Sequence, residues 1–245
     1  MKLEDVGKLH QKKYRDALGH FLVEGEHLVL ELQKAAHRQP ALLAATLYVT
    51  QRHADWRGPF ATQVLTERQM ARISDTRTPQ GMVAVVPILP PPAPRARERA
   101  VYLHEVQDPG NLGTILRSLA WFGGFRCLLS PGSVDPRNPK VVRASMGAIF
   151  HVAIETEIPL DALHARYARI ACLDTRGAAL RDAGFGACDC LVFGNEARGL
   201  PSDAPSMPGA QRYTVPGCGA IESLNLASVV NICVYELDRR SHGDA

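Results

Sequence analysis

Several features that mark exported or membrane proteins are lacking from this 245-residue chain. No run of apolar residues approaches the roughly 18 needed to span a bilayer. The N-terminal stretch MKLEDVGKLHQKKYRD is charged where a secretion signal would be apolar. We therefore expect a protein that is not exported, has no membrane partner and works in the cytoplasm.

Cysteines in metal-binding pairs are also lacking. Only Cys188 and Cys190 stand close together, and one intervening residue with no second pair does not match the spacing of a zinc site. The others fall singly, several of them inside apolar runs, where cysteine acts as a small hydrophobic residue. We expect all six cysteines to be reduced and buried, and we expect no bound metal.

The net charge of +3 is too small to indicate a nucleic-acid partner by itself. The distribution of charge is more informative, because basic residues gather in two places. These places could be solvated surfaces or contacts with phosphate groups. The basic residues are Lys2, Lys8, His10, Lys12, Lys13 and Arg15 near the N-terminus, and Arg95, Arg97 and Arg99 further on.

A proline-rich segment with mixed charges, residues 87–100, predicts a stiff linker, because proline disfavours both helices and strands. We place the domain boundary there, with a small α/β domain at 1–94 and a larger domain at 95–245. Hydrophobic periodicity in the first domain predicts strands at 21–25, 46–50 and 81–86 and helices at 27–36 and 66–74.

The second domain alternates apolar strands with helices, which is typical of a parallel sheet with both faces covered. Ligands bind such sheets at the carboxyl ends of the strands, so the candidate site lies in the loops after AVYLHEV, LVFGN and YTV, which are rich in Gly, Asn, Ser, Glu and Arg. Strands are predicted at 100–106, 125–130, 169–175, 188–195 and 211–216, and helices at 111–123, 139–150 and 224–239.

The first of these loops leads into the helix at 111–123. We expect Asn111 to cap this helix and Arg117 to lie off its apolar stripe, where a guanidinium could bind a phosphate or a carboxylate in two-pronged fashion. An ordinary surface arginine is the plainer alternative. The glycines here do not follow the G-x-G-x-x-G order, so a nicotinamide site has little support.

The other two loops are rich in glycine and polar residues. In LVFGNEARGLP, a buried strand ends at Gly194 and Glu196 follows, so these groups either face a cleft or form a simple turn. In VPGCGAIESLN, Ser223 and Asn225 stand where a helix begins. Helix capping would explain one of those two polar residues but not both.

Three segments, NLGTILRS, FGNEARGL and VPGCGAIESLNLAS, closely resemble in this order the motifs of SpoU-type (TrmH-like) RNA 2′-O-ribose methyltransferases of the SPOUT superfamily. The resemblance covers residues 100 to 240. The segments FLVEGEHLVLE and ISDTRTPQGMVAVV resemble that family's RNA substrate-binding domain, which is similar to small ribosomal proteins. Ala197 stands where the family usually has glycine.

This resemblance implies an α/β fold whose C-terminal parallel-sheet domain carries a deep trefoil knot. It implies S-adenosylmethionine as cofactor, with the adenine held by backbone groups around Gly194, Val215 and Leu224, and with Leu173 and Thr175 bordering the pocket. It also implies a homodimer, in which the arginine of the first motif reaches the partner's cofactor. The implied catalytic residues are Asn111, Arg117, Glu196, Ser223 and Asn225.

The resemblance further implies an RNA substrate, and a ribosomal-protein-like domain favours ribosomal RNA over transfer RNA. Two alternatives stay open: a non-catalytic RNA-binding or ribosome-assembly protein of the same fold, and a nucleotide-dependent oxidoreductase on an ordinary doubly wound sheet. The expected RNA contacts are Lys12, Lys13, Arg15, Arg143 and Ser145.

Overall fold

A computed structural model of the chain describes residues 1–76 and 78–242. The chain forms two compact units. The first comprises Met1–Pro90 together with Asp135–His151, and the second comprises Pro91–Val134 together with Val152–Ala245. Residues 135–151, which the sequence-based division places in the larger domain, therefore group with the N-terminal residues.

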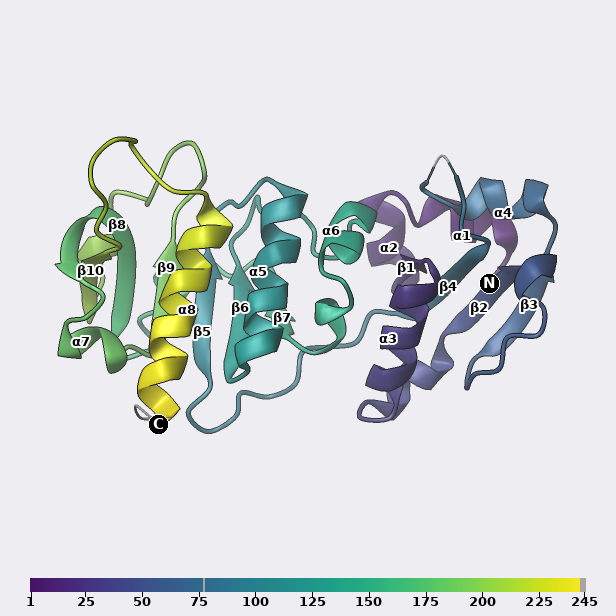
Figure 1. The fold of residues 1–245 in the computed structure, drawn as a ribbon, viewed down its shortest axis with the longest axis horizontal. Coiled ribbons are helices and arrows are strands. Elements are labelled where there is room, and N and C mark those ends of the chain that lie inside the picture. The colour runs from purple at the N-terminus through teal and green to yellow at the C-terminus, as the bar shows by residue number, and fades with distance from the viewer. Residues whose placement is uncertain (77, 243–245) are drawn as a thin grey trace. The chain divides into compact units, whose positions relative to one another are not determined.

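The first unit is built on a four-stranded sheet of order β1-β4-β2-β3 (Figure 1). Strand β4 runs antiparallel to β1 and β2, whereas β2 and β3 are parallel. All of the strands and helices predicted here are confirmed, but β3 was not predicted, because its residues are mostly exposed and lack an apolar pattern. The strands are β1 (His20–Glu24), β2 (Thr46–Thr50), β3 (Ala61–Leu65) and β4 (Met82–Pro87).

Helices of the first unit follow from local signals. Helix α3 (Glu26–Ala36) buries an apolar stripe that includes Leu28 and Leu32 against the sheet. Helix α4 (Glu67–Ile73) begins with a capping box, in which Thr66 and Gln69 satisfy each other's backbone N–H groups. The remaining helices are α1 (Leu3–Lys8), α2 (Lys12–Leu18) and α6 (Pro139–Ala144).

The second unit contains a six-stranded sheet of order β10-β8-β9-β5-β6-β7, in which every neighbouring pair is parallel. This confirms the predicted parallel sheet. The short strand β7 lies at the edge of the sheet and was not predicted. The strands are β5 (Arg99–Leu103), β6 (Phe125–Leu129), β7 (Ala153–Glu155), β8 (Ile170–Ala179), β9 (Cys190–Phe193) and β10 (Ala210–Thr214).

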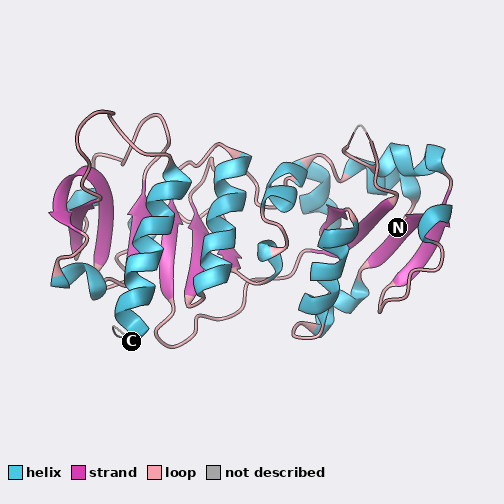
Figure 2. Cartoon of the chain, viewed as in Figure 1, coloured by secondary structure: helices cyan, strands magenta, loops and turns pink. Residues whose placement is uncertain are grey.

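Helices α5 (Pro109–Phe122) and α8 (Leu226–His242) lie side by side over this sheet, as Figure 2 shows. Their buried residues follow helical spacing, with Leu112, Ile115 and Leu119 in α5 and Val230 and Leu237 in α8. A third helix of this unit is the short α7 (Ala183–Gly186). Helix α5 follows β5 and helix α8 follows β10, so both helices begin at the end of the sheet where the carboxyl ends of the strands lie.

The proline-rich segment is held by a buried arginine. Residues 88–98 contain neither helix nor strand, as predicted. Arg126 is 3% exposed, donates to the backbone oxygen of Pro92 at 3.2 Å, and pairs with the carboxylates of Glu98 and Glu155. Burial opposes ionisation of Glu155, but hydrogen bonds from Arg166 and Arg126 lower its pKa below the usual value.

Three sequence-based expectations need correction. Helix α5 begins at Pro109 with Asp108 as its N-cap, so Asn111 does not cap it. The helix predicted at 139–150 ends at Ala144, because Met146 and Gly147 take left-handed backbone conformations. Cys218 is exposed, whereas the other five cysteines are buried, and burial raises the pKa of Cys172 to about 11.

Two kinds of feature are absent from the residues that the structure describes. No helix among residues 1–76 and 78–242 is both long and apolar enough to cross a membrane. The same residues contain no cluster of three or more His, Cys, Asp or Glu side chains that could hold a metal ion.

Candidate active site

The loops that carry the predicted motifs meet where the strand order of the second sheet reverses. From β5 the chain continues through α5 to β6 on one side, whereas β9 leads to β10 on the other side. Strands β5 and β9 are paired neighbours. In open α/β sheets, ligands bind at the carboxyl ends of two neighbouring strands whose following connections run to opposite sides.

Glu196 joins the loop after β9 to the start of α5. Its carboxylate accepts hydrogen bonds from the backbone N–H groups of Gln107 and Asp108, at 3.2 and 3.3 Å. It also accepts one from the side-chain nitrogen of Asn111 at 3.2 Å. A carboxylate near a helix N-terminus is favoured by the helix dipole, so this position suits the side chain.

Asn111 in turn connects to the third motif. The side-chain nitrogen of Asn225 donates to Oδ1 of Asn111 at 2.9 Å. The Oδ1 of Asn225 accepts from the backbone of Ala227 at 2.9 Å and so caps the start of α8. Because Asp108 caps α5, the amide of Asn111 is free to bridge Glu196 and Asn225. Residues from all three motifs are thereby joined in one polar network.

Asn195 is a site residue that the sequence-based reading did not single out. It is 7% exposed, and its side-chain nitrogen donates to the backbone oxygen of Glu105 at 2.7 Å. Its Oδ1 accepts from the backbone N–H groups of Ala197 and Arg198 at 3.0 and 3.1 Å. These bonds fix the loop that carries Glu196 to the end of β5. The polar residues after Gly194 indicated a functional loop in the sequence, but the sequence alone did not show which of them is buried.

Glu105 follows β5 and has an unusual backbone. Its φ is +49°, in the left-handed region that non-glycine residues rarely adopt. Its carboxylate pairs with the exposed Arg198, and its backbone N–H donates to Ser130 at 2.7 Å. Such strain concentrates at functional sites when the surroundings hold it in place, as these contacts do.

Gly194 permits a very close approach of two backbone segments. A Cβ at this position would lie 2.1 Å from the carbonyl carbon of Gly199. Asn195 and Gly199 exchange two backbone hydrogen bonds of 3.0 and 2.9 Å across this tight loop. Glycine is therefore required here by the backbone itself.

Substitution of Gly194 by alanine is expected to open the loop and to lower the thermal stability of the protein. It should also weaken binding of the cofactor that the sequence resemblance implies by at least tenfold, the effect on affinity of losing about one hydrogen bond. Differential scanning fluorimetry and calorimetric titration with S-adenosylmethionine would measure both effects. Gly217→Ala is the matched control, because a Cβ there has no neighbour within 4 Å. Equal stability and equal cofactor affinity of the two variants would contradict the requirement for glycine at position 194.

Four of the five predicted cofactor residues lie in or directly after three neighbouring strands, and the fifth, Leu224, lies in the loop before α8. Strand β10 pairs with residues 170–172 of β8 and then with Ala178 and Ala179, so residues 173–177 leave the ladder as a bulge. Leu173 and Thr175 lie in this bulge, and Thr214 donates to the backbone oxygen of Thr175 at 3.2 Å. Gly194 and Val215 directly follow β9 and β10.

Two of the predicted catalytic residues lie outside the polar network. Arg117 is exposed and makes no hydrogen bond or ion pair with the described residues. At 3.6 residues per turn, its side chain leaves α5 about 120° around the axis from Asn111. Ser223 is also exposed, in the loop before α8. The network therefore joins Asn111, Glu196 and Asn225 but not these two.

The expected RNA contacts are of two kinds. Lys12 and Lys13 are exposed on α2, and Arg143 is partly exposed on α6. Arg15 is 3% exposed and bonds to Asp135 at 2.9 Å and to two backbone carbonyls. Ser145 is fully buried and donates to the backbone oxygen of Val142. Burial does not fit the expectation that Arg15 and Ser145 contact RNA; they stabilise the first unit instead.

Taken together, the fold and site define an α/β protein in which a polar network and a strained residue lie at the switch point of a parallel sheet, the place where sheets of this class bind ligands. Residues 98–235 match the model of the SpoU rRNA methylase family, and residues 1–84 match the MRM3-like substrate-binding domain. The chain belongs to the SpoU rRNA methylase family.

Relatives of known function and structure agree with this assignment. The chain is 31% identical over 242 residues to the 23S rRNA (guanosine(2553)-2′-O)-methyltransferase RlmP of Bacillus subtilis, covering 96% of this chain and 95% of the relative. A TrmH-family protein from Porphyromonas gingivalis superimposes with a TM-score of 0.82 at 32% identity, covering 97% of each chain. An AdoMet-bound rRNA methyltransferase from Sinorhizobium meliloti gives 0.78 at 28% identity, covering 98% of this chain and 94% of that one.

Proposed function

We propose that this protein transfers a methyl group from S-adenosylmethionine to a ribose 2′-hydroxyl of ribosomal RNA. The observation that carries the proposal is the network of Glu196, Asn111 and Asn225, which joins one residue from each of the three family motifs. The Bacillus subtilis relative is named for this reaction on 23S rRNA, and the Sinorhizobium meliloti structure holds AdoMet.

The residues present fit such a cofactor. The bulge at residues 173–177 leaves backbone groups of Leu173 outside the ladder with β10, where they can bond an adenine edge, while Thr175, whose backbone bonds to Asp174 and Thr214, would border the pocket. Leu224 is 46% exposed in the adjoining loop and offers apolar surface to the rings. Gly194 and Val215 would contribute backbone contacts from the neighbouring strand ends. When bound, S-adenosylmethionine supplies the electrophilic methyl group.

The chain's own residues would orient the ribose and exclude water from its hydroxyl. The transfer would form a bond between the 2′-oxygen and the methyl carbon and break the carbon–sulfur bond, whose electron pair stays on sulfur, and the hydroxyl proton would finally pass to solvent water. A guanidinium with a pKa above about 12 is a poor proton acceptor. We therefore assign Arg117 to holding the ribose and its phosphate, with Ser223 and the network around Glu196 ordering the site.

We also propose a homodimer in which Arg117 serves the partner's site. Arg117 leaves α5 away from the network of its own subunit, which favours a role across an interface. Large apolar side chains of α5 and α8 are exposed in this chain: Trp121 by 84%, Tyr235 by 53% and Ile232 by 39%. Exposed apolar patches of this kind mark protein interfaces.

By membership of the family, we further propose the deep trefoil knot and a cytoplasmic location.

The first unit, with its match to a substrate-binding domain, is proposed to bind the RNA through Lys12, Lys13 and Arg143. Contacts from such side chains to phosphate groups fix orientation, whereas the methylated nucleotide is chosen by the RNA's folded shape. Transfer RNA and a non-catalytic assembly role are the alternatives, and the intact network argues against the second. An oxidoreductase is disfavoured by family membership.

Mapping ribose methylation in total RNA from cells with and without this protein tests the proposal. We expect loss of 2′-O-methylation at a ribosomal RNA nucleotide, restored by the wild-type gene and not by a Glu196→Ala variant. Loss at a transfer RNA position would show that the substrate is transfer RNA and not ribosomal RNA. An unchanged methylation map would refute the proposed function.

A further inference from the structure

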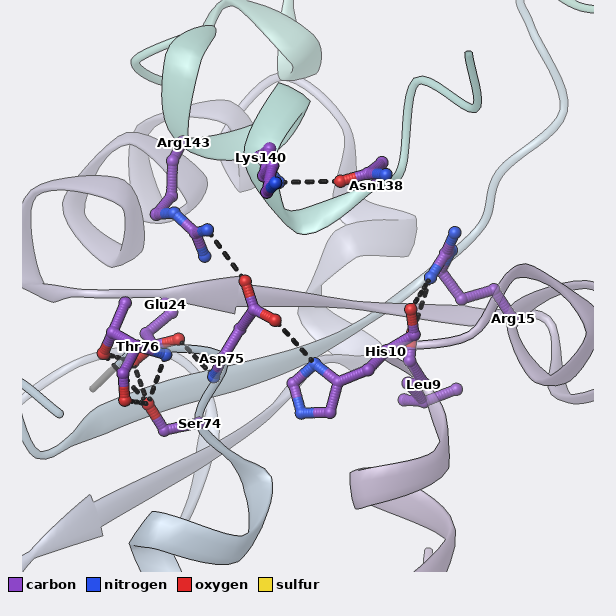
Figure 3. Close-up of polar contacts among 10 residues, drawn as sticks. All are labelled: Leu9, His10, Arg15, Glu24, Ser74, Asp75, Thr76, Asn138, Lys140 and Arg143. Carbon is purple, nitrogen blue, oxygen red and sulfur yellow. Dashed lines mark hydrogen bonds and ion pairs between the residues drawn. The ribbon is translucent and has the colours of Figure 1, made fainter. Parts of the chain in front are cut away.

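One carboxylate holds a surface loop of the first unit in place (Figure 3). Glu24, at the end of β1, accepts hydrogen bonds from the hydroxyls of Ser74 and Thr76 and from the backbone N–H of Asp75, the last at 3.0 Å. Donors from three successive residues thus converge on one side chain. The backbone of Asp75 is therefore fixed, and its own carboxylate is presented from a defined position.

Asp75 faces two basic side chains from other elements. Its Oδ2 accepts a hydrogen bond from Nη2 of Arg143 on α6 at 2.8 Å, and its Oδ1 lies 3.7 Å from Nδ1 of His10 (Figure 3). The side chains of Asp75 and Arg143 are each 33% exposed, so solvent reaches the pair. An ion pair this exposed contributes little to stability, which leaves the careful placement of Asp75 without a purely structural reason.

A second basic residue lies near Arg143 in sequence, on the same helix. Lys140 is exposed on α6, one turn before Arg143, and has no carboxylate partner among the described residues. Residues at this spacing lie on the same side of a helix. The start of the segment that carries α6 is anchored by the buried pair of Arg15 and Asp135. The segment that carries Arg143 and Lys140 is thus held in place, and Asp75 is the acid bonded to Arg143.

We propose that Asp75 acts as an internal substitute for an RNA phosphate, occupying Arg143 until RNA displaces it. The inference rests on the proposed RNA-binding function of the first unit and names its regulation. A carboxylate and a phosphate bind a guanidinium through the same forked geometry, so they compete for it. An RNA that places a phosphate at Arg143 replaces the Asp75–Arg143 ion pair with a phosphate–Arg143 pair, whereas RNA of arbitrary shape does not. Asp75 thereby lowers non-specific affinity and sets selectivity.

The test compares the full-length protein with Asp75→Asn, Arg143→Gln and the double variant. Fluorescence titration at several salt concentrations measures binding to transcribed large-subunit ribosomal RNA and to an unrelated RNA of equal length. Asp75→Asn is expected to bind the unrelated RNA about three- to tenfold more tightly and to lose selectivity, with a log–log salt slope steeper by up to about 1. Arg143→Gln should weaken binding to the ribosomal RNA and reduce its slope by about 1, with a smaller effect on the unrelated RNA, which leaves Arg143 paired with Asp75.

The double variant separates a specific competitor from a general charge effect. In the Arg143→Gln background, Asp75→Asn should change affinity less than about twofold, since the two residues act as a coupled pair. Asp55→Asn removes an exposed carboxylate of the first unit that pairs with none of the proposed RNA contacts, so it is the matched control and should lack the selectivity loss. Tightening that persists without Arg143, or that Asp55→Asn reproduces, overturns the inference, as does unchanged affinity in a folded Asp75→Asn protein.

Failure of the inference and failure of the proposed function give different results. If the wild-type protein binds and methylates ribosomal RNA but Asp75→Asn behaves like wild type, only the role of Asp75 is wrong. If the wild-type protein neither binds nor methylates RNA, the proposed function is wrong and the inference fails with it. Circular dichroism of each variant shows whether the fold survives.

Discussion

Replacement of Arg117 by alanine is expected to lower methyl transfer to RNA by about 100- to 1000-fold while cofactor affinity changes little. Arg117 is exposed and has no partner among the described residues, so the fold loses no contact when it is truncated. A preorganised cation that acts on the reacting group contributes a rate factor of this size. Single-turnover kinetics and calorimetric titration measure the two effects separately.

Arg117→Lys is the conservative control for this prediction. Lysine keeps the positive charge but lacks the planar fork that binds two oxygens at once, so activity between that of alanine and wild type is expected. An equal loss of methyl transfer and cofactor binding in Arg117→Ala would contradict the assigned role. It would place the arginine in the cofactor pocket instead.

Mixing two inactive variants tests whether Arg117 acts across the proposed dimer. A dimer of one Arg117→Ala subunit and one Glu196→Ala subunit contains one site with both wild-type residues only if the arginine comes from the partner. Random reassembly should then restore about a quarter of wild-type activity. No recovery, with mixed dimers demonstrated by mass spectrometry, would place both residues in one subunit's site.

Glu196→Ala is expected to cause a loss of similar size, about 100-fold or more in methyl transfer. This carboxylate accepts hydrogen bonds from Gln107, Asp108 and Asn111, so its removal leaves three donors without their acceptor and frees the start of α5 from the loop after β9. Asn111 would then lose one of the two partners that orient its amide. Steady-state methylation of ribosomal RNA measures the loss.

Two variants sharpen the reading of Glu196. Glu196→Gln keeps one acceptor oxygen but turns an NH₂ group toward backbone donors, so we expect partial activity. Glu222→Ala removes an exposed carboxylate from the loop before α8 and should leave activity within a few-fold of wild type. Comparable losses in Glu196→Ala and Glu222→Ala would show that overall charge, not the network, matters.

The sequence was sufficient for the elements with strong hydrophobic patterns. The central strands β5, β6 and β9 are buried along almost their entire length, and α5 and α8 have clear apolar stripes. Strands β3 and β7 escaped prediction for different reasons, because β3 is mostly exposed at a sheet edge and has no apolar pattern, whereas β7 has only three residues, too few for a pattern to appear. The shortened α6 reflects positive φ angles at Met146 and Gly147, which periodicity does not reveal.

For the site, motif order predicted which segments matter but not how each residue is used. Asn111 was expected to cap α5, yet Asp108 takes that position and releases the Asn111 amide to bridge two motifs. Local capping rules favour both residues equally, and only the fold decides between them. Asn195 was overlooked because its importance comes from burial against Glu105, a contact between residues 90 positions apart.

The most direct test of the account uses purified protein, S-adenosylmethionine with a labelled methyl group, and ribosomal RNA that lacks modifications. We predict that label enters the RNA and that complete alkaline hydrolysis, which cannot cut beside a methylated 2′-oxygen, leaves it in an uncut dinucleotide. Label recovered in single nucleotides would place the methyl group on a base, and label absent from RNA would mean no transfer. Either result would contradict a ribose methyltransferase.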